Sequence, residues 1–232
     1  MISEWWTYSP SDLLAFGPDA YWHVFETANR TYWPLPLILL VAWIAALIWL
    51  QQRPDRRRFV LVLLSVSAVC VGFIYFVESY QQINWAASNL AILFYALALA
   101  AVFLAAFPSP GKTRWKSVGL GMLVYAVFLH PFWPLVSGRS IDEAELIGLA
   151  PDPTAIGAIG LALGTRFPVV LIAPAAVWLA ISAMTLSTLG EVQAIVPISA
   201  LFLCAVLLTL TVSRRWRHQG KPQSDTPAAD RN

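Results

Sequence analysis

The residues of this sequence that could take part in chemistry are few, and each lies inside or at the end of a long apolar stretch. They are Glu78, Asn84, Asn89, His130 and Asp152. A strongly polar side chain inside a membrane is costly, so such residues are functional candidates. A carboxylate could contact a proton or a cation, and a histidine titrates near neutral pH. These five residues therefore form our candidate site.

His130 is the most informative of the five because two prolines follow it. Pro131 and Pro134 have no backbone N–H to donate, so two carbonyl groups in the preceding turn lose their helical partners. Carbonyls freed in this way need protein or water rather than lipid as partners. We therefore expect a kink at His130, with this face of the helix pointing into the bundle.

Each of the five residues also has a plainer, structural interpretation. Glu78 could be an interfacial carboxylate, Asn84 and Asp152 helix N-caps, Asn89 a helix–helix hydrogen bond and His130 a structural histidine. All five, however, fall in the outer half of the predicted membrane topology. We therefore predict that His130 lies within one bridging water of Glu78, Asn89 or Asp152, in a cavity open to the outer side.

The composition places the chain in a membrane. It has 232 residues, of which 58% are hydrophobic and 12% charged, and a mean hydropathy of +0.64. Soluble domains carry about twice this share of charge. The composition excludes a soluble enzyme, a secreted disulfide scaffold and a nucleic-acid-binding domain. Cys70 and Cys204 each lie within an apolar run and have no metal-ligand spacing, so we expect no metal or cofactor.

Apolar runs near the length of a membrane crossing predict an all-α bundle with seven transmembrane spans. The fifth span is short, since its 13 residues rise only about 20 Å. It could be a re-entrant or thinly spanning helix, begun by Asp152 and Pro153 and packed closely through its glycines. The predicted spans are 34–50, 59–79, 84–107, 117–136, 153–165, 168–187 and 192–213.

The positive charges predict the orientation. With seven crossings and the N-terminus outside, all but two of the 15 Lys and Arg residues, Arg30 and Arg139, fall on the cytoplasmic side. Ten of the 13 acidic residues then fall on the outer side. We therefore expect the N-terminus outside, the C-terminus in the cytoplasm and an acidic outer face.

Three segments lie outside the predicted spans. Residues 1–33 are expected to form an outer interfacial segment with short amphipathic helices, in which Pro18 begins one helix. A capping box that starts at Ser140 predicts a short outer helix over 144–149. Residues 214–232 are expected to be a basic, then polar, disordered cytoplasmic tail.

Several short motifs resemble an uncharacterised bacterial family of multi-helix integral membrane proteins, a domain of unknown function. They are Asn29 followed by Trp33-Pro34, Ile83-Asn84-Trp85-Ala86-Ala87, the proline-broken fourth span, and Pro151-Asp152-Pro153-Thr154. Trp85 departs from the expected pattern, which has proline there. The resemblance covers about residues 20–212. It implies a multi-pass protein of the bacterial inner membrane and supplies no activity and no site residues.

The sequence leaves three classes of function open. We expect a non-enzymatic accessory or structural component of a larger membrane complex, because no ionisable group is visible near the middle of the membrane. It would contact the lipid bilayer and could bind other membrane subunits through its transmembrane surface or its acidic outer face. We expect no nucleic-acid partner. The alternative is a small permease or channel with an outward-facing polar pocket. An intramembrane enzyme using His130 and Glu78 is the third and least favoured class.

Overall fold

The computed structural model describes residues 16–52, 56–107, 115–164 and 169–219, and over these residues it is helical and contains no strand. The first half comprises α1 (Pro18–Thr31), α2 (Leu35–Gln52), α3 (Arg57–Cys70) continued by η4 (Val71–Ser79) and η5 (Tyr80–Gln82), and α4 (Ala87–Ala105). The second half comprises α5 (Lys116–Val124) continued by η6 (Tyr125–Leu129), η7 (His130–Phe132) and α6 (Trp133–Val136), then η8 (Ile141–Glu143), α7 (Pro151–Leu163), α8 (Val169–Thr188), η9 (Val192–Ala194) and α9 (Ile195–Gln219).

Six of the seven predicted spans are present as helices that are long and apolar enough to cross a membrane. They are Leu35–Gln52, Arg57–Gln82, Ala87–Ala105, Lys116–Val136, Val169–Thr188 and Val192–Thr211. The remaining predicted span, the short fifth one, corresponds to α7 and is not among them. The last helix also continues past the predicted end of its span to Gln219. Residues 220–232, most of the predicted tail, lie outside the described residues, as do residues 1–15.

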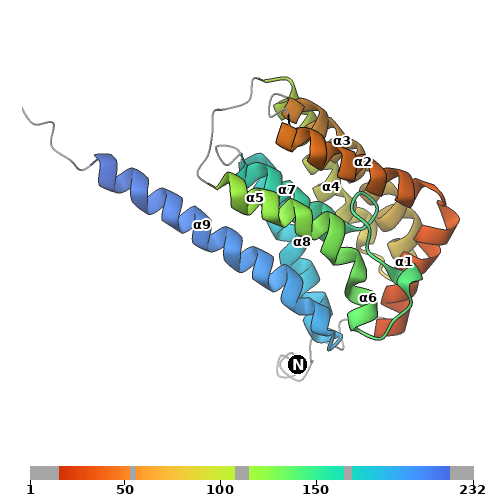
Figure 1. The fold of residues 1–232 in the computed structure, drawn as a ribbon. Coiled ribbons are helices and arrows are strands. Elements are labelled where there is room, and N and C mark those ends of the chain that lie inside the picture. The colour runs from red at the N-terminus through yellow and green to blue at the C-terminus, as the bar shows by residue number, and fades with distance from the viewer. Residues whose placement is uncertain (1–15, 53–55, 108–114, 165–168, 220–232) are drawn as a thin grey trace, which may run out of the picture.

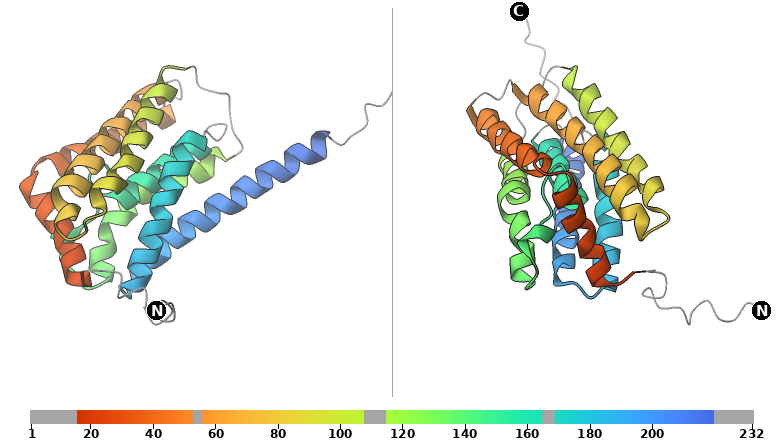
Figure 2. Two further views of the ribbon diagram at one scale, coloured as in Figure 1. Left: turned by 180° about the vertical axis from the view of Figure 1, so that it is seen from behind. Right: turned by 90° about the vertical axis from the view of Figure 1, so that its right-hand side faces the viewer.

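The bundle has two chemically different ends (Figure 1). We call one the basic end, because α3 and α5 begin there with Arg57 and Lys116. The opposite end, where the Val136–Pro151 and α8–α9 connections lie, is the acidic end and carries Glu143 and Glu191. Helix α1 packs across the acidic end, against η8 and η4 (Figure 2).

Helix α7 begins in the interior of the bundle rather than at either end. All 13 of its residues are buried. Asp152, in its first turn, accepts hydrogen bonds from Trp178 Nε1 and Ser182 Oγ, each 2.7 Å long. Trp178 lies nine residues into the 20-residue helix α8, about 14 Å from its first residue. Helix α7 therefore starts at half the depth of α8 and runs to the basic end.

The chain enters the interior from the acidic end without a helix. The predicted helix over 144–149 is wrong: Ser140 Oγ accepts a hydrogen bond from the Asp142 amide, but only the short 3₁₀ turn Ile141–Glu143 follows it. Gly148 then adopts a φ of +92°, and Ala150 is extended before Pro151. These conformations end a helix, because a positive φ favours glycine and a proline disfavours helical geometry in the residue before it.

The predicted close packing of the short helix is confirmed where it meets α5, at Gly160 and Gly164; a Cβ atom added to Gly119 would lie 2.9 Å from the Gly164 amide nitrogen. A Cβ atom added to Gly160 would lie 2.6 Å from the Gly119 carbonyl oxygen, and one added to Gly119 would lie 2.3 Å from the Gly160 carbonyl oxygen. The backbones of α5 and α7 are therefore in direct contact, as is common where small residues meet in membranes. The predicted N-cap is wrong, because Ala150 occupies that position and the Asp152 side chain turns to α8.

This contact predicts a large effect of a small substitution. Gly119→Ala should lower the unfolding free energy by about 1–3 kcal/mol, because the new methyl group overlaps the α7 backbone. Gly121→Ala is the matched control, since a Cβ atom there meets nothing within 4 Å. Thermal melting of the two purified variants in the same detergent checks this. Equal melting temperatures for both variants would contradict the α5–α7 contact.

Candidate functional site

The centre of the candidate site is a buried carboxylate–histidine pair. His130 Nε2 donates to Glu145 Oε2 over 3.1 Å, and Gln193 Nε2 donates to the same carboxylate oxygen. The side chains of His130 and Glu145 are 0% and 2% exposed, and Gln193 is buried with them. Three separate parts of the chain thus meet at one carboxylate. They are η7, η9 and residues 144–150, which we call the extended segment.

Arg139 connects this pair to the surface of the acidic end. Its Nη2 donates to Gln193 Oε1 over 2.7 Å, and its guanidinium lies 3.4 Å from the centre of the Trp22 ring. Its Nη1 is also 3.6 Å from Glu143 Oε2. Trp22, Arg139 and Glu143 line an open cleft of about 450 Å³, together with Asp19, Ala20 and His23. A continuous polar chain therefore runs from this cleft through Arg139 and Gln193 to Glu145.

Asp152 forms the inner part of the same polar region. Its carboxylate is fixed by Trp178 and Ser182 and interacts electrostatically with both Glu145 and His130. Its position in the first turn of α7 also faces it toward the positive end of the helix dipole. The interior of the bundle therefore holds two carboxylates and a histidine within electrostatic range of one another.

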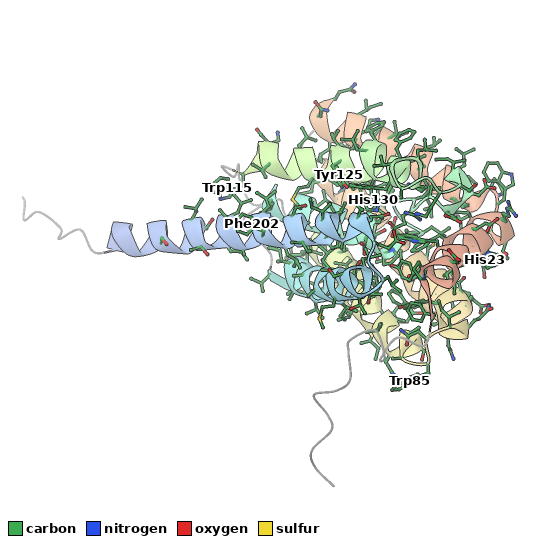
Figure 3. The ribbon with its side chains drawn as sticks, turned by 90° about the horizontal axis from the view of Figure 1, so that it is seen from below. His23, Trp85, Trp115, Tyr125, His130 and Phe202 are labelled. Carbon is green, nitrogen blue, oxygen red and sulfur yellow. The ribbon has the colours of Figure 1, made fainter. Side chains whose placement is uncertain are left out.

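Tyrosine side chains cover this region on several sides. Tyr21 of α1 and Tyr75 of η4 are fully buried, and both interact electrostatically with Glu145 and Asp152. Tyr125 of η6 lies beside His130, with ring centroids 5.8 Å apart (Figure 3). The site is therefore surrounded by aromatic rings and phenol groups rather than by lipid.

Two buried polar atoms of the carboxylate–histidine pair itself have no hydrogen-bond partner among the described residues. They are His130 Nδ1 and Glu145 Oε1. Buried polar atoms of folded proteins are nearly always hydrogen-bonded to protein or to ordered water. The site is therefore suited to bind water or another small polar ligand. The described residues contain no group of three or more His, Cys, Asp or Glu side chains placed to hold a metal ion.

Helix irregularities place these side chains. The predicted break at His130 is present: the helix passes from a π-helical segment, Tyr125–Leu129, into the 3₁₀ turn His130–Phe132 that contains Pro131. The longer π-helical segment Val71–Ser79 carries Tyr75, and Ser79 Oγ donates to the Ile74 carbonyl there. Such π segments occur often at functional sites, because they rotate side chains away from the regular helical face.

Helix α1 holds the extended segment in place at the acidic end. Asn29 Nδ2 donates to the carbonyls of Asp142 and Ala144, over 2.8 and 2.9 Å, and Arg30 pairs with the Asp142 carboxylate over 2.7 Å. Tyr21 and Trp22 of this helix are buried against the bundle, whereas the sequence predicts an interfacial segment here. Glu145 follows directly after the residues that Asn29 binds.

Two charged groups of the acidic-end connection have shifted pKa values. Burial raises the pKa of Glu143, and the positive charge of Arg139 opposes this. Burial also lowers the pKa of Arg139, and the carboxylates of Glu145, Glu191 and Glu143 oppose this. Both side chains are thus partly removed from water at the mouth of the site, where each supports the charge of the other.

The five candidate residues do not form one cluster. His130 and Asp152 are buried in the same polar region, whereas Glu78 and Asn89 are exposed. Asn84 is half-buried, and its Oδ1 accepts from the Ala86 amide in the turn before α4. His130 is hydrogen-bonded to Glu145, which the sequence analysis did not include among the candidates.

The residues missed by the sequence analysis are Glu145, Gln193 and Arg139. Arg139 and Glu145 lie in a connection between predicted spans, where polar residues are expected and carry no signal. Gln193 is the second residue of the last predicted span, and a polar residue at the end of a span is equally ordinary. Only the extended path of residues 144–150 into the interior makes Glu145 a buried group. The motif Pro151-Asp152-Pro153 was the available hint, since a helix with two prolines in its first turn begins after an extended residue.

The contacts of Asn29 predict the stability of the segment that carries Glu145. Asn29→Ala removes two hydrogen bonds, each worth about 1 kcal/mol. We therefore expect amide hydrogen exchange at residues 143–144 to become about tenfold faster or more. Thr27→Ala, an exposed change on the same helix, should leave exchange unaltered. Equal exchange in the two variants would show that α1 does not hold this segment.

Comparisons with known proteins agree with this architecture without adding a function. Searches of curated proteins and of solved structures each found no match. A family model described as a family of unknown function, DUF6064, matches residues 18–219. This range begins with α1 and ends with the last residue of α9. The chain therefore belongs to the DUF6064 family.

Proposed function

We propose that the protein is a small permease that carries an ion through the membrane by way of the Glu145–His130 site. The observation that supports this most strongly is the burial of two carboxylates and a histidine at the start of a half-length helix. Ionisable groups at membrane depth are expensive and mark ion pathways and proton relays. Transporters often place their sites where a discontinuous helix begins near the midplane.

The cleft at the acidic end supplies the entrance in this proposal. An ion entering there meets Arg139 and Glu143 first, then Gln193 and Glu145, and then Asp152. The basic half of the bundle is filled by α7. Passage therefore requires α7 to shift against α5, to which it is packed through the contact between Gly119 and Gly160.

The proposal includes a topology of seven crossings in a bacterial inner membrane. The extended segment and α7 together would make the fifth crossing, with the acidic end outside and the basic end in the cytoplasm. The support for this orientation is the clustering of Lys and Arg at one end. No enzymatic step is part of this proposal.

An accessory role in a larger membrane complex is the second candidate. Helix α9 diverges from the bundle toward its C-terminal end (Figures 1 and 2). It exposes Phe202, Val206 and Leu210 along its length. Such a helix could pack against another membrane subunit. The reason for preferring this role from the sequence was the lack of a buried ionisable group, and the buried Glu145, His130 and Asp152 remove that reason.

Ion flux tests the permease proposal. Purified protein in liposomes should carry an ion current under an imposed voltage, measured in turn with proton, sodium, potassium and chloride gradients. Glu145→Gln should reduce this flux at least tenfold, because the carboxylate charge is removed while its shape is kept. Glu78→Gln, an exposed carboxylate at the same end, should leave the flux unchanged.

Two results would contradict the proposal. One is that vesicles containing the protein are no more permeable to these ions than empty vesicles. The other is that Glu145→Gln and Glu78→Gln have the same flux. In the first case, co-purification of further subunits in mild detergent would favour the accessory role.

A further inference from the structure

Resting on the proposed function, we propose that the ion is the proton, relayed between His130 and Glu145, and that Arg139 excludes metal cations. Three features of the site support this assignment: the atoms that are already hydrogen-bonded, the atoms that are free, and the charge at the entrance.

The bonded atoms oppose a metal cation. Glu145 Oε2 already accepts two hydrogen bonds, from His130 Nε2 and Gln193 Nε2. Both oxygens of Asp152 accept as well, from Trp178 and Ser182. Hard cations bind through several oxygens at once, typically six or more. Among the described residues, Glu145 Oε1 is the one oxygen of the two carboxylates that accepts no hydrogen bond, so the site offers a metal cation few free lone pairs.

The free atoms suit a proton. His130 Nδ1 and Glu145 Oε1 are buried and have no hydrogen-bond partner among the described residues. Nδ1 can accept a proton while Nε2 holds the hydrogen bond to Glu145. A free nitrogen on one side of the imidazole and a carboxylate on the other form an input and an output for one proton.

The transfer balances without any other reactant. A proton that binds His130 Nδ1 makes the ring an imidazolium, and the N–H bond at Nε2 then breaks as its proton passes to Glu145 Oε2. The ring is then neutral with its proton on Nδ1, and the carboxylate becomes a neutral carboxylic acid. Loss of that proton toward Asp152 restores the carboxylate. Exchange of the ring proton from Nδ1 to Nε2 through bridging water restores the starting tautomer, so the net result is the inward movement of one proton.

The charge at the entrance favours protons over metal cations. Arg139 is held between the outer cleft and the site by its hydrogen bond to Gln193, its contact with the Trp22 ring and its pairing with Glu143. A fixed guanidinium at this constriction repels a metal cation, as positive side chains do in other selective pores. A proton can cross the same point by hopping between water and hydrogen-bonded groups.

Groups from every surrounding element are compatible with this assignment. Tyr21 of α1, Tyr75 of η4 and Tyr125 of η6 face the two carboxylates, and the Arg139 guanidinium interacts electrostatically with Glu145. Tyrosine hydroxyl groups both donate and accept hydrogen bonds. They can order the water that bridges the free atoms of the relay.

A single vesicle assay distinguishes this proposal from the broader one. Liposomes with an internal pH dye are given a negative internal potential by potassium and valinomycin, in buffers without sodium. The wild-type protein should acidify the interior, and the reversal potential should follow the pH gradient. Glu145→Gln and His130→Gln should each slow acidification at least tenfold, with Glu78→Gln as the unchanged control. In a parallel measurement with tracer sodium added outside the vesicles, Arg139→Gln should admit sodium that the wild type excludes.

The outcomes separate the two claims. Wild-type vesicles that carry sodium, potassium or chloride but do not acidify would overturn the proton relay and leave the permease standing. Vesicles that carry no ion would overturn both. If the Glu145 or His130 variants fail to fold, judged by gel filtration, the reversal potential of the wild type still decides whether the proton is the carried ion.

Discussion

Everything in this structure depends on one constraint: backbone that is not helical at membrane depth must find its hydrogen bonds within the protein. Residues 144–150 meet this constraint with local partners. Thr154 Oγ1 accepts from the Gly148 amide and donates to the Ala150 carbonyl, and the Leu149 and Ala150 amides both donate to the Leu146 carbonyl. Asn29 Nδ2 donates to the carbonyls of Asp142 and Ala144, where this segment begins. Because these bonds are formed inside the protein, a helix can begin in the interior.

The buried charges follow from that geometry. A helix that starts in the interior brings its first turn, and with it Asp152, to the middle of α8. The extended segment before it carries Glu145 into the interior, where His130 and Gln193 bind it. Burying ionised groups costs several kcal/mol each unless they are paired and hydrogen-bonded. The aromatic cover and the hydrogen-bond chain to Arg139 are therefore needed to keep these charged groups buried, whatever function they serve.

The sequence predicts the helices of this fold well and the site only in part. Apolar length identifies the six long helices, and the prolines after His130 predict the break that turns this residue inward. Glycine spacing predicts the contact of Gly160 with its neighbour. The path of residues 144–150 is not predictable in the same way, because it depends on partners more than 100 positions away, such as Asn29. Glu145 therefore looks like an ordinary loop carboxylate until the fold is known, and Glu78, which ends an apolar run, looks like a candidate although it is exposed.

The most direct test of this account is a double-mutant cycle between Asp152 and Ser182, because their hydrogen bond can form only if α7 begins at the depth of the middle of α8. Unfolding free energies of Asp152→Ala, Ser182→Ala and the double variant would be measured in lipid bicelles. The account predicts a coupling of about 1–3 kcal/mol, as expected for side chains in one buried network. Asp152→Ala combined with Thr188→Ala, an exposed position near the end of α8, should be additive. Additivity for Asp152 and Ser182, within about 0.5 kcal/mol, would contradict the interior start of α7.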